Sequence, residues 1–344
     1  MILIPTRSYR SILDTRQTEE AINLIKDFFQ RQLANELKLH RVTAPIIVPR
    51  GIGVNDDLSG IQKPVHFKAK DIPGLDIEIV QSLAKWKRLM LADYDIPCGY
   101  GIYTDMNAIR PDEALDNTHS LYVDQWDWEL VLNSEERDLS CLKRAVRKIY
   151  SMLRQLEFFI HEHYPSIEPV LPGEITFIHA EEALERYPKL LSEEREYQLA
   201  KEYGAIFIIG IGGNLKNGQP HDVRAPDYDD WVTETEYGFK GLNGDIILWN
   251  SVLEKNLEIS SMGIRVDKVS LLKQLALANM LYRRELYFHR RLLDEKLPLT
   301  MGGGIGQSRI CMQLLRKAHI GEVQVSVWSE HDRQECKKHN ILLL

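Results

Sequence analysis

The segment 120–130 constrains the fold more than any other part of the chain, because its side chains alternate in character. Successive side chains of a β-strand point to opposite faces of a sheet. One face is polar and consists of Val123, Gln125, Asp127 and Glu129, and the other is aromatic and consists of Tyr122, Asp124, Trp126 and Trp128. A solvated outer face is the alternative interpretation of the polar side. The tryptophans favour a strand that is covered on both sides, with the polar face turned toward a ligand or water.

Hydrophobic periodicity predicts the other elements. Asp14 and Gln17 form a capping-box pattern at the start of a long amphipathic helix that extends to Leu37. Further helices are expected over residues 83–93, 139–160, 180–187, 192–203 and 269–294. Strands are expected at 77–80, 102–110, 175–178, 205–211, 245–249, 257–262 and 323–327. Because strands and helices do not alternate strictly, the prediction is an α+β fold with a mostly antiparallel β-sheet flanked by helices.

The net charge and the uniform composition along the chain limit the possible classes of protein. Lys and Arg number 43 against 50 Asp and Glu, which gives a formal net charge of −7. This balance argues against a protein that wraps nucleic acid, although a local basic groove stays possible. No linker-like stretch divides the sequence, so we expect a single domain over residues 1–344.

The chain lacks the marks of a membrane or secreted protein. Its longest apolar runs, such as 205–211, fall far short of the ~20 residues that span a bilayer. Residues 1–7 do not form a secretory signal. Four cysteines stand apart in the sequence, without metal-ligand spacing: Cys98, Cys141, Cys311 and Cys336. We therefore expect free thiols in a reducing, cytoplasmic compartment.

A glycine cluster near the C-terminus is a candidate phosphate site. Gly302, Gly303, Gly304 and Gly306 precede Arg309 and are expected to open a helix, where backbone N–H groups can approach an anion. The cluster is not a P-loop, since no Gly-Lys-Ser/Thr follows. A tight turn that serves packing is the alternative. Arg309 favours the phosphate interpretation, because its guanidinium can reach the same anion.

Other polar segments are candidates for binding chemistry. Arg110 ends a predicted strand and enters the polar face described above. Asp245 and Glu258 sit on two strand-like segments and together can hold Mg²⁺ beside nucleotide phosphates, unless they are unrelated surface acids. Arg224 opens an acidic, turn-prone loop in which Asp229 can hold an ammonium group.

In their order along the chain, these segments resemble the catalytic core of class II aminoacyl-tRNA synthetases. The strand that ends at Pro45 resembles the first, dimer-forming motif, residues 110–129 the second and residues 302–309 the third. The resemblance is closer still to the ammonia-dependent, A-type asparagine synthetases. It is carried over nearly the whole chain by QSLAKWKR at 81–88, YVDQWDWE at 122–129, HDVRAPDYDDW at 221–231 and the glycine cluster.

This resemblance implies an ATP-dependent ligase that makes L-asparagine from L-aspartate and ammonia through a β-aspartyl-AMP intermediate, releasing AMP and pyrophosphate. Arg110 would contact the α-phosphate and Arg309 the γ-phosphate, with Mg²⁺ on Asp245 and Glu258 and the four glycines at the nucleotide. The implied aspartate-binding residues are Ser82, Lys87, Asp127, Arg224, Asp229, Ser261 and Arg265, and Gln125 would position the reacting carboxylate.

The resemblance also places a carboxylate beside ammonia. Asp56 lies in a loop over residues 51–60 and matches the family residue that guides or deprotonates ammonium, while its neighbour Asp57 is an alternative. Pro45 and the first helix imply a homodimer. Two departures from the tRNA-synthetase pattern are Pro111, which displaces Glu113 by one position, and Val123, which replaces an aromatic residue.

Three competing functions are less consistent with the sequence. An aspartyl- or asparaginyl-tRNA synthetase needs an anticodon-reading domain of roughly a hundred residues, and the first helix begins too early for one. A glutamine-dependent enzyme needs an N-terminal cysteine, whereas residue 2 is Ile2. A regulatory paralogue without activity is expected to lose its catalytic arginines, and Arg110 and Arg309 are both present.

Overall fold

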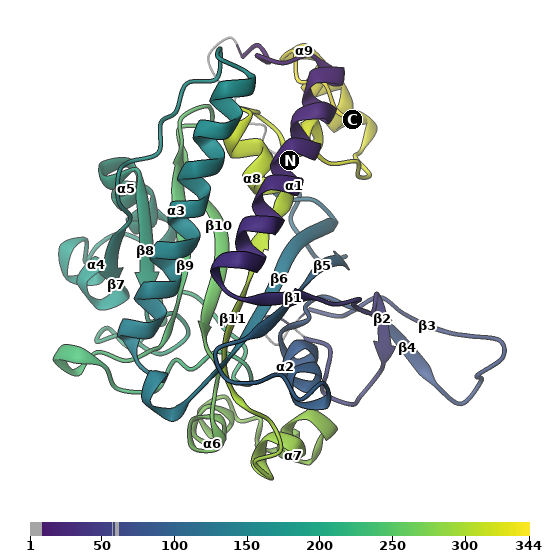
Figure 1. The fold of residues 1–344 in the computed structure, drawn as a ribbon, viewed down its shortest axis with the longest axis vertical. Coiled ribbons are helices and arrows are strands. Elements are labelled where there is room, and N and C mark those ends of the chain that lie inside the picture. The colour runs from purple at the N-terminus through teal and green to yellow at the C-terminus, as the bar shows by residue number, and fades with distance from the viewer. Residues whose placement is uncertain (1–8, 57, 59–61) are drawn as a thin grey trace.

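The computed structural model of the chain describes residues 9–56, 58 and 62–344. Its centre is an eight-stranded sheet in the order β1-β5-β6-β11-β10-β9-β8-β7 (Figure 1). The strands are β1 (Leu39–Arg41), β5 (Gly101–Ile109), β6 (Tyr122–Leu132), β11 (Leu299–Gly306), β10 (Lys255–Ile264), β9 (Asn243–Asn250), β8 (Ala205–Ile209) and β7 (Thr176–His179). The sheet thus brings the second and third sequence motifs, on β6 and β11, next to each other.

The sheet is mixed rather than antiparallel throughout. Its five inner pairs are antiparallel, as predicted, but β1 pairs with β5 and β7 with β8 in parallel. Parallel neighbours need a long crossover connection. Helices α4 (Ala180–Arg186) and α5 (Ser192–Tyr203) supply it between β7 and β8, and a smaller sheet with α2 (Ala84–Asp93) supplies it between β1 and β5. The periodicity predicted most strands of the main sheet, β11 excepted, but not their direction.

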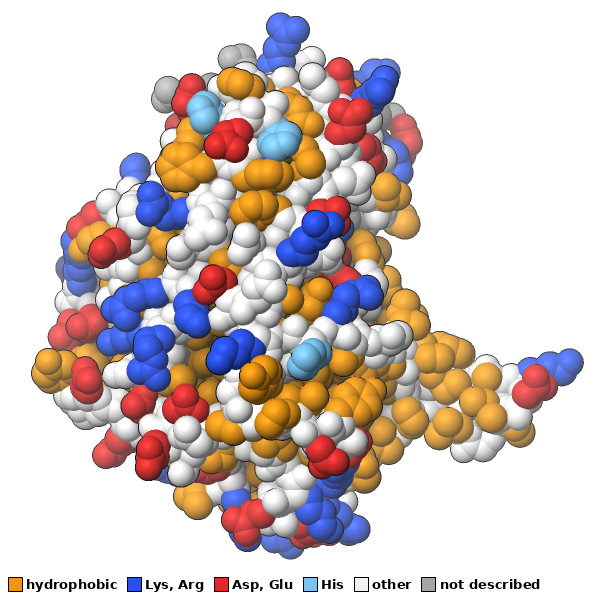
Figure 2. Space-filling model, in the orientation of Figure 1, with side chains coloured by type: hydrophobic (Ala, Val, Ile, Leu, Met, Phe, Trp, Pro, Cys, Tyr) orange, Lys and Arg blue, Asp and Glu red, His pale blue; other side chains and the backbone are white. Residues whose placement is uncertain are grey.

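The smaller sheet forms an arm that projects from the body (Figure 1). It has the order β2-β4-β3, with β2 (Ile47–Pro49), β4 (Asp76–Ile79) and β3 (His66–Lys68). Pro45 lies two residues before the edge strand β2, which is a suitable place for a residue that cannot donate to a sheet ladder. Hydrophobic side chains gather on this arm (Figure 2). The exposed ones include Ile46, Ile47, Phe67 and Ile72.

Two long helices lie side by side across the face of the main sheet that carries the tryptophans (Figure 1). They are α1 (Thr15–Glu36), which begins at the predicted Asp14–Gln17 capping box, and α3 (Leu139–His163). Trp126 and Trp128 are fully buried, and the ring of Phe29 on α1 lies 4.7 Å from that of Trp126. The aromatic face of β6 is therefore core, which leaves the polar face for the opposite side, where α2 packs.

Three sequence predictions in the C-terminal third were wrong. The helix predicted over 269–294 is broken into α6 (Lys268–Leu277), the 3₁₀ helix η3 (Leu281–Glu285) and α7 (Tyr287–Leu293), because Asn279 adopts a left-handed conformation with φ of 56°. The glycine cluster does not open a helix, since it lies within β11 and α8 (Gln307–Leu314) begins only after Gly306. Residues 323–327 follow the 3₁₀ helix η4 (Ile320–Glu322) without forming a strand, and Val325 and Val327 are exposed.

The remaining elements are short. They are α9 (Glu330–Lys338) and the 3₁₀ helices η1 (Ser134–Glu136) and η2 (Glu236–Gly238). The tail over residues 330–344 carries no motif and is predicted from the sequence to lie on the surface, but Cys336 and Ile341 are buried and anchor it to the core. All four cysteines are free, as predicted. Among the described residues, no helix combines the length and the apolar character needed to cross a bilayer.

Candidate active site

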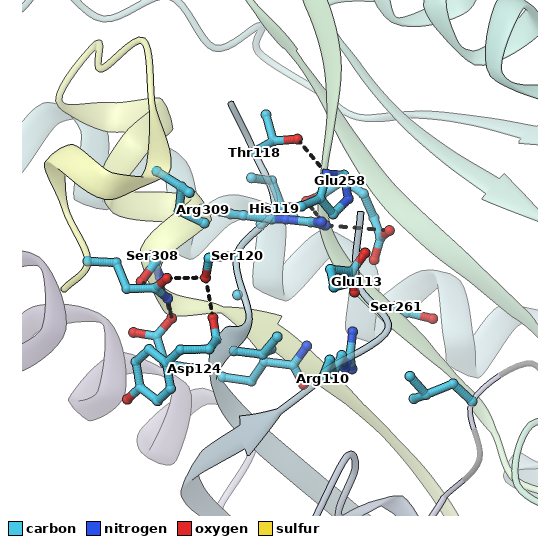
Figure 3. A pocket seen from close by; sticks show the side chains of 18 of the residues that line it. Arg110, Glu113, Thr118, His119, Ser120, Asp124, Glu258, Ser261, Ser308 and Arg309 are labelled. Atoms are coloured by element: carbon cyan, nitrogen blue, oxygen red, sulfur yellow. Dashed lines mark hydrogen bonds and ion pairs between the residues drawn. The ribbon is translucent and has the colours of Figure 1, made fainter. Parts of the chain in front are cut away.

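A cavity of about 510 Å³ opens on the polar face of β6 (Figure 3). Its lining comes from separate parts of the sequence that the fold brings together. Arg110 follows β5, Gln125 lies on β6, Ser261 on β10 and Arg309 on α8. Arg224 enters from the loop before β9. The cavity therefore collects side chains from the motifs at 122–129, 221–231 and 302–309.

Two arginines of the cavity have few protein partners. Arg110 Nη2 donates a single long hydrogen bond, 3.4 Å, to the backbone oxygen of Gln81, and its Nε has no partner among the described residues. Burial lowers the pKa of Arg110, although the group stays far from neutral. Arg309 Nη1 donates to the backbone oxygen of Glu258 at 3.0 Å and lies 3.5 Å from its carboxylate. Both guanidinium groups keep donors for an anionic ligand.

The two predicted metal ligands lie on neighbouring strands of the sheet. Asp245 on β9 is opposite Ser261 on β10, and Glu258 precedes a register shift between Glu258 and Ser260. A bulge of this kind changes which side chains share a face. It accounts for Glu258 and Ser261 both lining the cavity although they are three residues apart.

The environment of Asp245 is strongly charged. Its carboxylate is paired with Arg224, which also pairs with Asp222. Burial, reinforced by the negative charge of Glu258, raises the pKa of Asp245 to about 7 even though Arg224 lowers it. A cation that replaced the Arg224 contact would favour the charged carboxylate. Among the described residues, no group of three or more His, Cys, Asp or Glu side chains forms a metal site.

Two glycines of β11 lie close to side chains of the neighbouring strand β6. Gly302 lies opposite Glu129, Gly304 opposite Asp127 and Gly306 opposite Gln125. A Cβ atom at position 302 would lie 2.0 Å from Glu129 Oε2, and one at 304 would lie 2.2 Å from Gln125 Oε1. These two glycines therefore make room for polar side chains of β6. Only Gly306 has ordinary space around it, with its nearest neighbour 3.4 Å away.

A buried network of charged side chains adjoins this part of the sheet. We call it the charge network, and it consists of Lys87, Asp127, Glu129, Asp229 and Arg265, each 4% exposed or less. Lys87 reaches from α2 to pair with Asp127 and donates to the backbone oxygens of Trp128 at 3.0 Å and Gly303 at 3.3 Å. Four of these five residues are predicted site residues.

Glu129 is the member that the sequence analysis did not assign to the site. It accepts from Arg265 Nε at 3.0 Å and Nη2 at 2.9 Å, and from the Thr300 hydroxyl at 2.7 Å, while Arg265 also pairs with Asp229. Burial would raise the pKa of Glu129, but Arg265 and Lys87 outweigh it and lower the pKa. The signal was present, because Glu129 lies two residues from Asp127 on the polar face of the strand.

Ser82 lies at the start of the helix that carries Lys87. Its hydroxyl oxygen accepts a hydrogen bond from the Ala84 backbone N–H at 3.2 Å, a local contact at the first turn of α2. Since the side chain is half-buried, it is positioned close to the site without belonging to the charge network.

Asp56 lies at a second cavity of about 450 Å³. Its side chain is buried, and Oδ1 is 3.7 Å from Lys85 Nζ. Lys85 also donates to Asp227 at 3.2 Å, and Asp227 accepts from Arg283 at 3.0 Å and contacts His289 at 2.9 Å. The sequence analysis missed this cluster, although Lys85 and Asp227 lie within two of its motifs. The alternative candidate, Asp57, lies outside the described residues.

Comparison with known proteins agrees with this geometry. The model of the aspartate-ammonia ligase family matches residues 16–340. Aspartate–ammonia ligases from Parabacteroides distasonis and Clostridium perfringens are each 55% identical, over 99% and 100% of this chain and 99% of their own length. The enzyme of Malacoplasma penetrans is 53% identical over 96% of this chain and 99% of its own.

Solved structures of tRNA synthetases share the fold at low sequence identity. Asparaginyl-tRNA synthetase of Entamoeba histolytica, in complex with asparaginyl-adenylate, superposes with a TM-score of 0.66 at 16% identity, over 90% of this chain and 66% of that one. The Pyrococcus horikoshii enzyme gives 0.66 at 15% identity, over 90% and 68%. This chain thus spans about two thirds of the length of those synthetases.

The polar face of β6, the glycines of β11 and the full-length identity of 53–55% lead to one conclusion. The chain belongs to the aspartate–ammonia ligase family, ATP-dependent enzymes of asparagine synthesis, and is built on the class II aminoacyl-tRNA synthetase fold.

Proposed function

We propose that the enzyme works in two steps through a β-aspartyl-AMP intermediate. The β-carboxylate of aspartate attacks the α-phosphorus of ATP and displaces pyrophosphate, and ammonia then attacks the acyl carbon and displaces AMP. A free carboxylate is too poor an acyl donor for ammonia, so activation must come first. The observation that carries the proposal is the adjacency of the buried charge network to an open cavity edged by arginines.

Arg110 would act on the α-phosphate. It follows β5, beside β6, and lines the cavity. A donor with few partners in the free enzyme can turn to the charge that develops on the phosphoryl oxygens in the transition state. Arg309, on α8, would hold the γ-phosphate from the other side, next to Gly306, which also lines the cavity.

Asp245 and Glu258 fit a Mg²⁺ ion that is held mainly by phosphate oxygens. Mg²⁺ commonly takes one or two protein carboxylates and fills its other positions with phosphates and water. When bound, the ion would neutralise part of the triphosphate charge. The chain's own contribution is to present the two carboxylates on adjacent strands and to keep Arg224 as the counter-charge of Asp245 when the ion is absent.

The charge network would bind aspartate by exchanging partners. Lys87 and Arg265 would bind the β-carboxylate and position it together with Gln125, whereas Ser82, Asp127 and Asp229 would take the α-amino group. Each of these charges already has an opposite partner in the free enzyme. Substrate would therefore replace existing ion pairs rather than bring isolated charges into a buried site, which limits the desolvation cost.

One assay tests both steps. Aspartate-dependent ATP–pyrophosphate exchange reports formation of the adenylate, and AMP release with ammonium or with glutamine reports the second step. We expect exchange without any nitrogen source, and asparagine formation with ammonium but not with glutamine. Efficient glutamine-driven synthesis by the pure protein would contradict the proposal, as would AMP release without exchange.

Asp56 is assigned to the ammonia step. Asp56→Asn should keep much of the exchange reaction yet lose asparagine formation, because only the second step uses a proton acceptor near ammonia. Equal loss of both half-reactions would show instead that the residue orders the whole site. Asp76→Asn, an acid on β4 whose side chain is 42% exposed, serves as the matched control and should change neither step.

We also propose that two chains associate as a homodimer. The support is the exposed hydrophobic surface of the projecting arm, where Ile46, Ile47, Phe67 and Ile72 are between 41% and 56% exposed (Figure 2). Such a cluster at a sheet edge suits a self-complementary two-fold interface. Light scattering should give twice the chain mass, and a stable, active monomer would refute this part of the proposal.

A further inference from the structure

Gln81 differs from every other buried amide side chain of the protein. Its exposure is 0%, and among the described residues neither Oε1 nor Nε2 has a hydrogen-bond partner. All other buried Asn and Gln side chains form at least one hydrogen bond. An amide that is buried without partners destabilises the folded state. A buried polar side chain that is retained despite this destabilisation is a candidate for binding a ligand.

The backbone of Gln81 locates it between two groups of the proposed reaction. Its N–H donates to Asn55 Oδ1 at 2.9 Å, and the same oxygen accepts the Asp56 N–H at 3.0 Å. On the other side, its backbone oxygen accepts the hydrogen bond from Arg110 at 3.4 Å. Gln81 is thus tied to the residue assigned to ammonia and to the arginine assigned to the α-phosphate. The acyl carbon of the adenylate must lie between these two groups.

We propose that the Gln81 carboxamide binds the reacting centre of the second step, which rests on the two-step function proposed above. Its Oε1 accepts a hydrogen bond from the incoming ammonia, and its Nε2 donates to the acyl oxygen. Ammonia attacks the acyl carbon and forms the new C–N bond. The bond between the acyl carbon and the oxygen that bridges it to phosphorus then breaks. AMP leaves with the electron pair, and the surplus proton on nitrogen passes to Asp56.

A carboxamide suits this position for a physical reason. It supplies an acceptor and donors without a net charge, so it neither competes with Arg110 for the phosphate nor adds a charge beside Asp56. Ammonia needs an acceptor to orient its lone pair toward the carbon, and the acyl oxygen needs a donor as negative charge grows on it. One side chain can fill both roles only while it is not engaged by the protein.

The test is the near-isosteric variant Gln81→Leu, measured for stability and for both half-reactions. Because no hydrogen bond is lost, the variant should unfold in urea at the same or a higher denaturant concentration than the wild type. Pyrophosphate exchange should stay within about threefold of wild type. Asparagine formation should fall, with KM for ammonium raised by about tenfold or more, the loss expected for one or two hydrogen bonds.

Gln313→Leu is the matched control. Gln313 is equally buried, but it accepts from Asn250 at 2.9 Å and donates to the Trp249 backbone oxygen at 3.1 Å, away from the cavity. This variant should lower stability and leave KM for ammonium unchanged. The inference is overturned if Gln81→Leu lowers stability as Gln313→Leu does, or if its KM for ammonium stays at the wild-type value. Absence of exchange in the wild type would instead overturn the two-step function itself.

Discussion

The charged side chains at the two ends of the candidate site differ in how fully they are paired with other protein groups. In the charge network, Lys87 and Arg265 are bound to Asp127, Glu129 and Asp229, and all five side chains are almost completely buried. In the open cavity, the polar contacts among the described residues are one long hydrogen bond for Arg110 and the contacts with Glu258 for Arg309. We expect the ion-paired side chains of the charge network to contribute to both folding and binding. The arginines with few protein partners keep hydrogen-bond donors for a ligand.

This difference has a physical origin in what each end is proposed to hold. Aspartate is small and would stay bound through both steps. The paired strands of the sheet can therefore hold the side chains that bind it in position before it arrives. The nucleotide phosphates change charge and leave during the reaction. Arginines that are held loosely can follow that change without breaking the sheet. The comparison predicts that substitutions in the charge network affect stability and activity together, while those in the open cavity affect activity alone.

The largest effect is expected for Glu129→Gln. Removing one partner of a buried ion pair leaves Arg265 and Lys87 undercompensated, which typically costs about 3–5 kcal/mol. Urea unfolding at pH 7 measures the loss. Glu20→Gln, an exposed partner of Arg16, is the control and should change stability by less than about 1 kcal/mol. A Glu129→Gln variant as stable as its control would break the comparison.

The same variant should show a characteristic pH dependence. The pKa of Glu129 is lower in the folded chain than in the unfolded chain, so its ionised form stabilises the fold above the unfolded value of about 4. That stabilisation disappears as the pH falls through the lower, folded value. The difference in unfolding free energy between wild type and Glu129→Gln should therefore be largest near neutral pH and shrink below about pH 4. A constant difference would contradict this assignment.

Arg110→Ala should separate activity from stability. Loss of a donor that acts on transition-state charge typically costs ~10²-fold or more, and we expect that loss in aspartate-dependent pyrophosphate exchange. Stability should change little, because only the 3.4 Å contact with Gln81 is removed. The measurement pairs exchange rates with thermal unfolding, and Arg16→Ala on the exposed face of α1 is the control. A strongly destabilised Arg110→Ala protein would show that Arg110 contributes to stability as the charge network does, which would contradict the comparison.

Two glycines of β11 offer a smaller test within one strand. Gly302→Ala places a methyl group against Glu129 and the backbone oxygen of Trp128, so overpacking should cost about 1–3 kcal/mol. Gly306→Ala finds ordinary van der Waals space and should be nearly neutral for stability. Urea unfolding of the two variants side by side measures the contrast. Equal destabilisation would mean that the glycines serve the strand itself rather than the side chains of β6.

The smallest effect is expected for Arg309→Met. Its contacts with Glu258 lie at the surface, so their loss should change stability by less than about 1 kcal/mol. KM for ATP should rise about tenfold, because one charge-assisted contact to a phosphate is lost. Steady-state kinetics with ATP and with aspartate varied in turn distinguish the two ends. A rise in KM for aspartate of the same size would place Arg309 at the wrong end of the site.

The sequence alone identified most of the elements and the family of the chain. The alternation of β6 was read correctly because a strand has a strict two-residue period, and the Trp126 face is core. The α1 boundary followed from the local capping box. The family assignment rested on long motifs, and the comparisons confirm it. The roles of the individual site residues stay predictions.

What only the tertiary structure decided depends on partners distant in the sequence. Nothing local shows that Gly302 makes room for Glu129, 173 residues away, and so the glycine cluster was mistaken for a helix start. Strand direction at β1 and β7 depends on crossovers, not on periodicity. The missing partners of Gln81 could not be foreseen either, because hydrogen-bond satisfaction is a property of the folded interior. Local patterns determined most of the elements and the polar face of β6, and packing determined which charges are paired with one another and which line the open cavity.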